Sequence, residues 1–170
     1  MNILKVVVDI VDLLIEGLNI NQDVFDDDIK NINYKQEDKT IFYDFSKTFN
    51  DSKLKVHFEI YDQVYCYVGF TVNGLYVKEK KAKYDLRLAL QVMGYVISCM
   101  RSIQNMYPTI ELFEFAADEP HEAQYDKLLP RLSSKLGFTY TKTPYTAKPT
   151  IRDKIEKNVK MSACYEIYLQ

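Results

Sequence analysis

The sequence predicts an α+β domain built on a mixed, largely antiparallel β-sheet flanked by helices. Three observations lead to this fold class. Apolar and polar residues alternate with a period of two over three segments between residues 41 and 72, as in strands. Apolar residues then recur at spacings of three and four from Tyr84 to Met106, as in a helix. Beyond that helix, shorter alternating segments enclose a second helical pattern.

The composition is that of one folded domain with a sizeable core. Of the 170 residues, 47% are hydrophobic and 14% are aromatic, and we expect residues 1–170 to form a single domain. The chain has five glycines but neither Gly-x-Gly-x-x-Gly nor Gly-x4-Gly-Lys-Ser/Thr. This argues against the dinucleotide-binding and P-loop classes.

The net charge of −2 argues against a general nucleic-acid-binding protein. The charge is uneven, because residues 1–50 hold 10 acidic and 5 basic side chains, whereas residues 51–110 hold 5 and 8. Two interpretations remain open. The basic middle steers an anionic ligand, or the pattern is ordinary surface charge.

The cysteines and histidines predict no metal site. Cys66, Cys99 and Cys164 are widely spaced, and His57 and His121 are the two histidines of the chain. We interpret the cysteines as small core residues in a reducing, cytoplasmic compartment, and both histidines as surface residues.

The first 18 residues predict an amphipathic helix that packs on the domain. Lys5, Asp9, Asp12 and Glu16 form one polar stripe, and three acids within an apolar stretch do not fit an export signal. No segment has the length of a membrane span, so no membrane association is expected. The following polar stretch, residues 19–39, is interpreted as a solvated connection.

The alternating segments predict an antiparallel meander. Its apolar positions are Ile41, Tyr43 and Phe45, then Leu54, Val56, Phe58 and Ile60, then Val64, Cys66, Val68, Phe70 and Val72. Residues 61–63 predict a tight turn. Asn73 and Gly74 predict a type I′ hairpin turn that leads into a fourth short strand over residues 75–79.

The second half predicts strand, helix, strand, strand. The first strand spans Thr109 to Ala117, and its helix begins at Asp118-Glu119-Pro120 and ends at Gly137. A strand over residues 138–142 follows. A polar connection over residues 144–161 then leads to a last strand over residues 163–169.

This order and one local motif resemble the GNAT N-acetyltransferase fold, and most closely the small GNAT-like proteins of bacteriophages. The motif reads Ile-Glu-Leu-Phe-Glu-Phe-Ala-Ala-Asp-Glu-Pro over residues 110–120, Tyr-Asp-Lys-Leu over 125–128, Arg-Leu over 131–132 and Leu-Gly-Phe over 136–138. The resemblance covers roughly residues 40–143 and implies a bacterial or phage-infected cytoplasm.

The resemblance implies an acetyl-CoA site in a V-shaped opening between the fourth and fifth strands. Phe115 and Ala116 of the fifth strand then lie beside the cofactor. The family holds the pyrophosphate in a loop Arg/Gln-x-x-Gly-x-Gly/Ala. Residues 91–96 are a chance match to this loop inside a helix, and residues 78–85, at the true position, have no glycine. The basic side chains there either bind phosphate by charge or form a solvated turn: Lys78, Lys80, Lys81, Lys83 and Arg87.

The resemblance also implies direct attack by a substrate amine, with a general base and a tyrosine acid. Tyr125 lies in the matching helix, earlier than the usual position at Ser134, and is either the acid or a core-facing ring. Glu114 is the preferred base and Glu59 the second. The alternative for Glu114 is a misjudged face at a strand end.

Two functions follow from the resemblance. One is transfer of an acetyl group from acetyl-CoA to an amine of a protein or small molecule. The other is a catalytically inactive GNAT-fold phage protein that acts as a binding module, an inhibitor of a host protein or a virion component. The missing glycines favour the second, and tyrosines such as Tyr61, Tyr65, Tyr67 and Tyr76 either form a protein-contact surface or are covered by the N-terminal helix.

Overall fold

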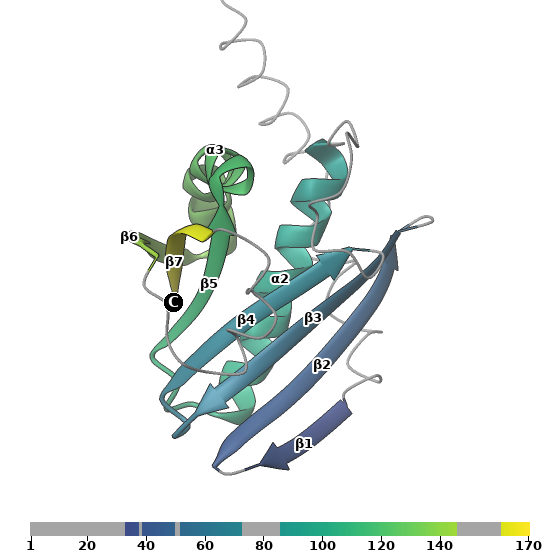
Figure 1. The fold of residues 1–170 in the computed structure, drawn as a ribbon, viewed down its shortest axis with the longest axis vertical. Helices are drawn as coiled ribbons and strands as arrows, with labels where there is room; N and C mark the ends of the chain where they lie inside the picture. The colour runs from purple at the N-terminus through teal and green to yellow at the C-terminus, as the bar shows by residue number, and fades with distance from the viewer. Residues whose placement is uncertain (1–32, 38, 50–51, 73–85, 146–160) are drawn as a thin grey trace, which may run out of the picture.

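The computed structural model describes residues 33–37, 39–49, 52–72, 86–145 and 161–170 (Figure 1). They form a seven-stranded sheet with two helices, and the strand order is β1-β2-β3-β4-β5-β7-β6. One neighbouring pair, β4 and β5, is parallel, and the other described pairs are antiparallel. The predicted α+β class with a largely antiparallel sheet is confirmed.

The first half of the sheet is the predicted meander. It comprises β1 (Asn33–Glu37), β2 (Thr40–Phe49), β3 (Ser52–Tyr61) and β4 (Tyr65–Val72). The apolar positions of β2 and β3 are buried, as are Cys66 and Val68 of β4, because one face of the meander packs on the helices. Val64, which the alternation also places among them, precedes β4 and is 45% exposed. The predicted tight turn between β3 and β4 is confirmed, with positive φ angles at Asp62 and Gln63.

The second half is built from β5 (Leu112–Asp118), β6 (Phe138–Pro144) and β7 (Met161–Leu169). β7 lies between β5 and β6 and is antiparallel to both. Because β5 also pairs with β4, it joins the two halves of the sheet.

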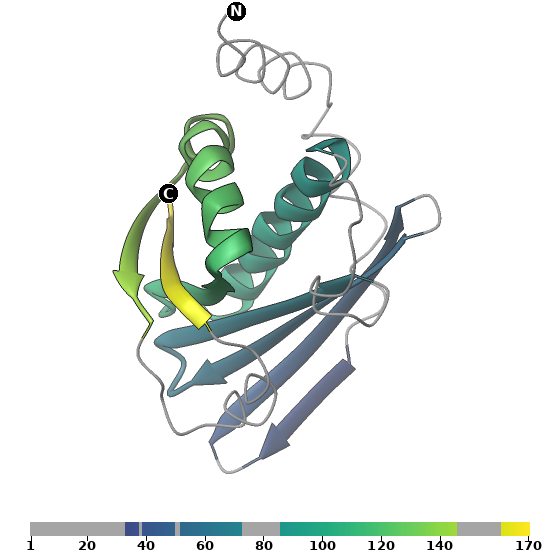
Figure 2. The same cartoon turned by 45° about the horizontal axis from the view of Figure 1, so that its top comes forward.

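Both described helices lie on one face of the sheet (Figure 2). α2 (Leu86–Met106) packs on β2 and β3, and α3 (Glu119–Leu136) packs on β5, β6 and β7. α3 begins where the sequence predicts, because Asp118 caps it by accepting a hydrogen bond from the His121 N–H at 3.2 Å. It ends at Gly137, whose φ of 67° is left-handed.

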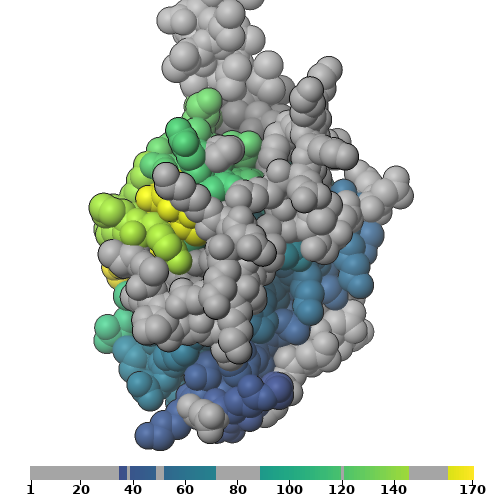
Figure 3. All heavy atoms as spheres, viewed as in Figure 1, coloured from purple at the N-terminus to yellow at the C-terminus, as the bar shows by residue number. Residues whose placement is uncertain are grey.

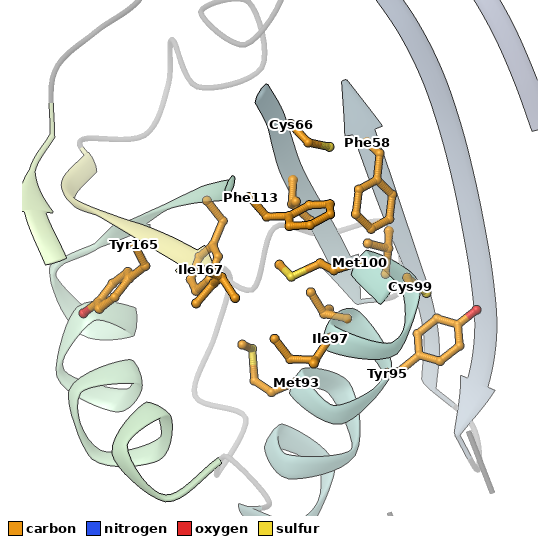
Figure 4. Close-up of a cluster of buried hydrophobic side chains, with 14 of the residues drawn as sticks. Phe58, Cys66, Met93, Tyr95, Ile97, Cys99, Met100, Phe113, Tyr165 and Ile167 are labelled. Carbon is orange, nitrogen blue, oxygen red and sulfur yellow. The ribbon is translucent and has the colours of Figure 1, made fainter. Parts of the chain in front are cut away.

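The core lies between this face and the helices. Figure 4 shows Phe58, Cys66 and Phe113 of the strands directed toward Met93 and Met100 of α2. Phe58 makes edge contacts with Phe45 and with Phe113, at centroid distances of 5.4 and 6.3 Å. This core therefore connects the meander with the second half of the sheet.

Three predictions about the fold were wrong. Residues 33–37 belong to β1, although the segment 19–39 was expected to be a connection. Residues 109–111, expected to begin the strand, precede β5, and the Ile110 N–H closes a turn by donating to the Tyr107 carbonyl at 3.1 Å. His57 and His121 are partly buried, with exposed side-chain fractions of 32% and 16%, because each packs beside carboxylates.

Several predictions lie outside the described residues. They are the N-terminal helix, the hairpin turn at residues 73–74, the short strand at 75–79 and most of the connection after β6.

Candidate functional site

The parallel strands β4 and β5 separate part of the way along their length. Their ladder has three residue pairs, which end at Tyr67 opposite Glu114. Beyond this pair, residues 68–72 of β4 remain paired with β3, and residues 115–118 of β5 remain paired with β7 (Figure 1). We call the two diverging segments the β4–β5 splay and the Tyr67–Glu114 pair its apex.

Aromatic rings occupy the helix side of the splay. Phe70 of β4 and Phe115 of β5 meet edge to face at 6.0 Å between centroids, and Tyr125 of α3 lies 6.4 and 5.1 Å from them. Tyr165 of β7 stacks on Phe115 at 5.3 Å. The Tyr125 ring is thus a core ring next to the splay, with 8% of the residue exposed.

The opposite face of the sheet carries polar residues near the apex, and we call it the polar face. In Figure 1, α2 lies behind β3 and β4, so that view looks toward the polar face. Figure 3 shows the molecule from the same side. The register places Glu59, Tyr67 and Glu114 side by side on β3, β4 and β5. All three are buried, with 1%, 8% and 5% of each residue exposed. Burying carboxylates in this way requires hydrogen-bond donors nearby.

Tyrosine hydroxyls supply such donors. Tyr65 donates to Glu114 Oε1 at 2.9 Å, and Tyr61 donates to Glu59 Oε2 at 2.5 Å. The two tyrosine rings also contact each other, with centroids 5.8 Å apart. These contacts hold both buried carboxylates in fixed positions beside the apex.

His57 lies between two carboxylates on the polar face. Its Nδ1 is 2.5 Å from Asp44 Oδ1, and its Nε2 is 3.4 Å from Glu59 Oε1. Lys55 Nζ lies 3.4 Å from Asp44 Oδ2. Burial alone lowers the pKa of His57, but hydrogen bonds to Glu59 and Asp44 outweigh it and leave the pKa raised. His57 therefore keeps its proton to a higher pH than an ordinary histidine side chain does.

A second polar cluster ties α3 to β6 and β7. Lys142 Nζ lies 2.7 Å from Glu122 Oε1 and 2.7 Å from Asp126 Oδ2, and Tyr165 donates to Asp126 Oδ1 at 2.8 Å. The hydrogen bond from Lys142 lowers the pKa of both carboxyl groups. The three charged side chains are partly exposed, and Lys142 is shared between the two carboxylates, so we assign the cluster a role in packing.

The structure separates the two residues predicted to act in catalysis. Glu114 lies on the polar face, whereas Tyr125 packs on Phe115 on the helix side. Glu114 forms the apex together with Tyr67, and Phe115, on which Tyr125 packs, directly follows it in the chain. Ala116 pairs with Cys164 of β7 within the splayed part of β5.

The predicted phosphate-binding side chains cannot be placed. Lys78, Lys80, Lys81 and Lys83 lie outside the described residues. The backbone of Arg87 belongs to the first turn of α2, and its side chain is not described. The chance glycine-loop match at residues 91–96 lies inside α2, as expected.

The cluster around His57 was missed by sequence reasoning. Asp44 and His57 occupy polar positions in two predicted neighbouring strands, which is the signal that could have linked them. The β2–β3 register pairs Asp44 directly with His57, and a shift by one residue would have placed them on different faces. The alternation alone does not determine that register.

Comparisons of the chain with protein-family models, with curated proteins and with solved structures find no match. Within the described ranges, no group of three or more His, Cys, Asp or Glu side chains is arranged to hold a metal ion. None of the described helices is both long and apolar enough to cross a membrane.

Proposed function

We propose that the chain is a GNAT-like protein that binds acetyl-CoA in the β4–β5 splay and transfers its acetyl group to an amine. One observation carries the proposal. β4 and β5 are parallel, pair over three residues and then separate. This is the arrangement that the resemblance implies for a cofactor site between the fourth and fifth strands.

The splay offers backbone groups to an extended ligand. Among the described strands, residues 68–72 pair with β3 and residues 115–118 pair with β7, and the other edge of each segment faces the splay. Strand edges carry N–H and C=O groups that bond to extended chains. The pantetheine arm of CoA is extended and contains amides, which matches this chemistry.

The chemical step joins the amine to the acetyl carbon. The amine nitrogen attacks the thioester carbonyl, the new N–C bond forms, the C–S bond breaks and CoA leaves as a thiolate. The nitrogen must lose a proton during this step. Glu114 at the apex and Tyr125 beside Phe115 remain the residues that the resemblance favours for proton transfer.

The second candidate is a GNAT-like binding module without catalysis, such as an inhibitor of a host protein or a virion component. Residues 78–85 contain no glycine, so the usual backbone cradle for the pyrophosphate is missing. The burial of Tyr125 among aromatic rings also favours this candidate. Its partner would then be a protein rather than a small amine.

Calorimetric titration with acetyl-CoA tests the first candidate. We expect binding in the micromolar range for the unmodified chain. Ala116→Leu adds bulk to the splayed part of β5 and should weaken binding at least tenfold. Ala123→Leu makes the same change at an exposed position of α3 and serves as the matched control.

No detectable heat at millimolar acetyl-CoA would reject cofactor binding and leave the binding module. If acetyl-CoA binds and neither Ala116→Leu nor Ala123→Leu changes its affinity, the cofactor lies somewhere other than the splay.

A further inference from the structure

Three neighbours, Phe42, Asp44 and Glu59, contact the His57 ring on the polar face. Phe42 of β2 stacks on it with centroids 5.9 Å apart and an interplanar angle of 23°. Asp44 lies 2.5 Å from Nδ1, and because a carboxylate only accepts, Nδ1 donates to it. Nε2, which lies 3.4 Å from Glu59 Oε1, is therefore the nitrogen that accepts a proton in the neutral ring.

Toward the splay, the residue of β4 beside His57 is a glycine. This partner in the register is Gly69, two residues beyond the apex residue Tyr67. A Cβ placed at Gly69 would have no heavy atom within 4 Å. At this position of β4, therefore, no side chain separates His57 from the splay.

We propose that His57 accepts the proton of the amine that attacks acetyl-CoA in the splay. This inference rests on the proposed function and names the proton acceptor within it. As the N–C bond forms and the C–S bond breaks, one amine proton moves to Nε2 of His57. The CoA thiolate that leaves is protonated by solvent.

The carboxylates around His57 suit this role. Asp44 fixes the ring through Nδ1, and Glu59, 3.4 Å from Nε2, stabilises the positive imidazolium that forms. Lys55 also lies beside this group, 3.4 Å from Asp44 Oδ2. β4 faces His57 with Gly69, which carries no charge.

Glu114 is less suited to the same step. The residue is 5% exposed, and its carboxylate already accepts a hydrogen bond from Tyr65. His57, with 32% of its side chain exposed, can return the proton to solvent after each turnover.

Chemical modification tests the placement of His57 without a known acceptor. Diethyl pyrocarbonate acylates neutral imidazole, and peptide mass spectrometry separates His57 from His121. We expect saturating acetyl-CoA to slow acylation of His57 at least tenfold and to leave His121 unchanged. Gly69→Leu should slow acylation of His57 in the free protein as well, because the added side chain fills the open space.

Thiol release from acetyl-CoA tests the proton transfer, with n-butylamine, spermidine and Nα-acetyl-lysine amide as acceptor probes. The protein's own cysteines are buried and should not contribute to the signal. We expect the rate to rise with pH through the titration of His57, and His57→Gln to remove this rise and lower the rate about 100-fold. His121→Gln is the control and should keep the rate and its pH dependence.

The outcomes separate the two proposals. If acetyl-CoA does not bind, or if no probe is acetylated, the proposed transfer itself fails. If transfer occurs and His57→Gln keeps the rate and pH profile, His57 is not the acceptor. If Glu114→Gln abolishes transfer and His57→Gln does not, Glu114 is the residue that accepts the amine proton. Binding of acetyl-CoA without protection of His57 would likewise overturn the inference.

Discussion

His57 and His121 each lie beside an aspartate, but their further neighbours differ. His121 sits at the start of α3, where Asp118 bonds both its backbone N–H and its ring. His57 has a second carboxylate, Glu59, at its other nitrogen and Gly69 across the strand pair. The sequence shows two similar histidines, and the register decides which of them combines two carboxylates with open space.

The raised pKa of His57 predicts a stability that depends on pH. Because this pKa is higher in the folded than in the unfolded chain, the contribution is complete below the unfolded pKa and is lost as pH rises through the folded one. We expect the free energy of unfolding of the unmodified protein to exceed that of His57→Gln at about pH 5.5, and by a smaller margin at about pH 8.5. Urea unfolding at both pH values measures this.

Asp44→Asn provides the second variant for this measurement. Removing that carboxylate should reduce the pH-dependent part of the difference, because Asp44 is one of the two groups that raise the pKa. A difference between wild type and His57→Gln that is the same at both pH values would contradict the prediction.

At the scale of elements, the two helices and the long strands agree with the sequence, whereas β1 does not. β1 reads Asn-Tyr-Lys-Gln-Glu, and residues 35–37 are exposed. It lacks the apolar alternation that would mark a strand, and among the described strands it pairs with β2 alone. Its conformation depends on that partner strand rather than on its own composition.

Two glycines in different elements predict opposite effects of the same substitution. Gly137 has a φ of 67°, so Gly137→Ala should destabilise the protein by about 1 kcal/mol. A Cβ there would lie 3.5 Å from Arg101 Nη2, which is ordinary contact, so the cost arises in the backbone. At Gly69, in a strand, an added Cβ would meet no heavy atom within 4 Å. Gly69→Ala should therefore stabilise the protein by about 0.5–1 kcal/mol.

Thermal or urea unfolding of both variants checks this pair. Equal destabilisation by the two substitutions would show that Gly69 is constrained by something other than its open surroundings.

At the scale of the whole molecule, the two halves of the sheet share few backbone contacts. β4 and β5 pair over three residues, whereas β2 and β3 pair over ten. The halves are joined further by the core, in which Phe58 and Phe113 contact each other across the β4–β5 boundary. The splay can exist because side-chain packing replaces part of the missing ladder.

Phe113→Ala therefore tests how the halves are joined. Phe113 is 1% exposed, and its truncation should cost about 3–5 kcal/mol, a large part of the stability of a typical domain. Val64→Ala, at a residue that is 45% exposed, should change the stability by less than about 0.5 kcal/mol. Chemical denaturation measures both, and a small loss in Phe113→Ala would show that the halves are held together otherwise.

The sequence by itself determined the α+β class, the meander, the two helices and the caps of α3. These depend on local periodicity and on single residues such as Asp118 and Gly137, which neighbours in the chain are enough to specify. It also named Glu114, which the structure places at the apex of the splay.

Only the tertiary structure decided the register, the strand order and the separation of β4 from β5. Those features arise from pairing between segments far apart in the chain, and a shift of one residue would send Asp44 to the other face. The same pairing placed His57 opposite Gly69 and Tyr125 on the far side of the sheet from Glu114. The site is therefore a product of long-range pairing, which no local pattern encodes.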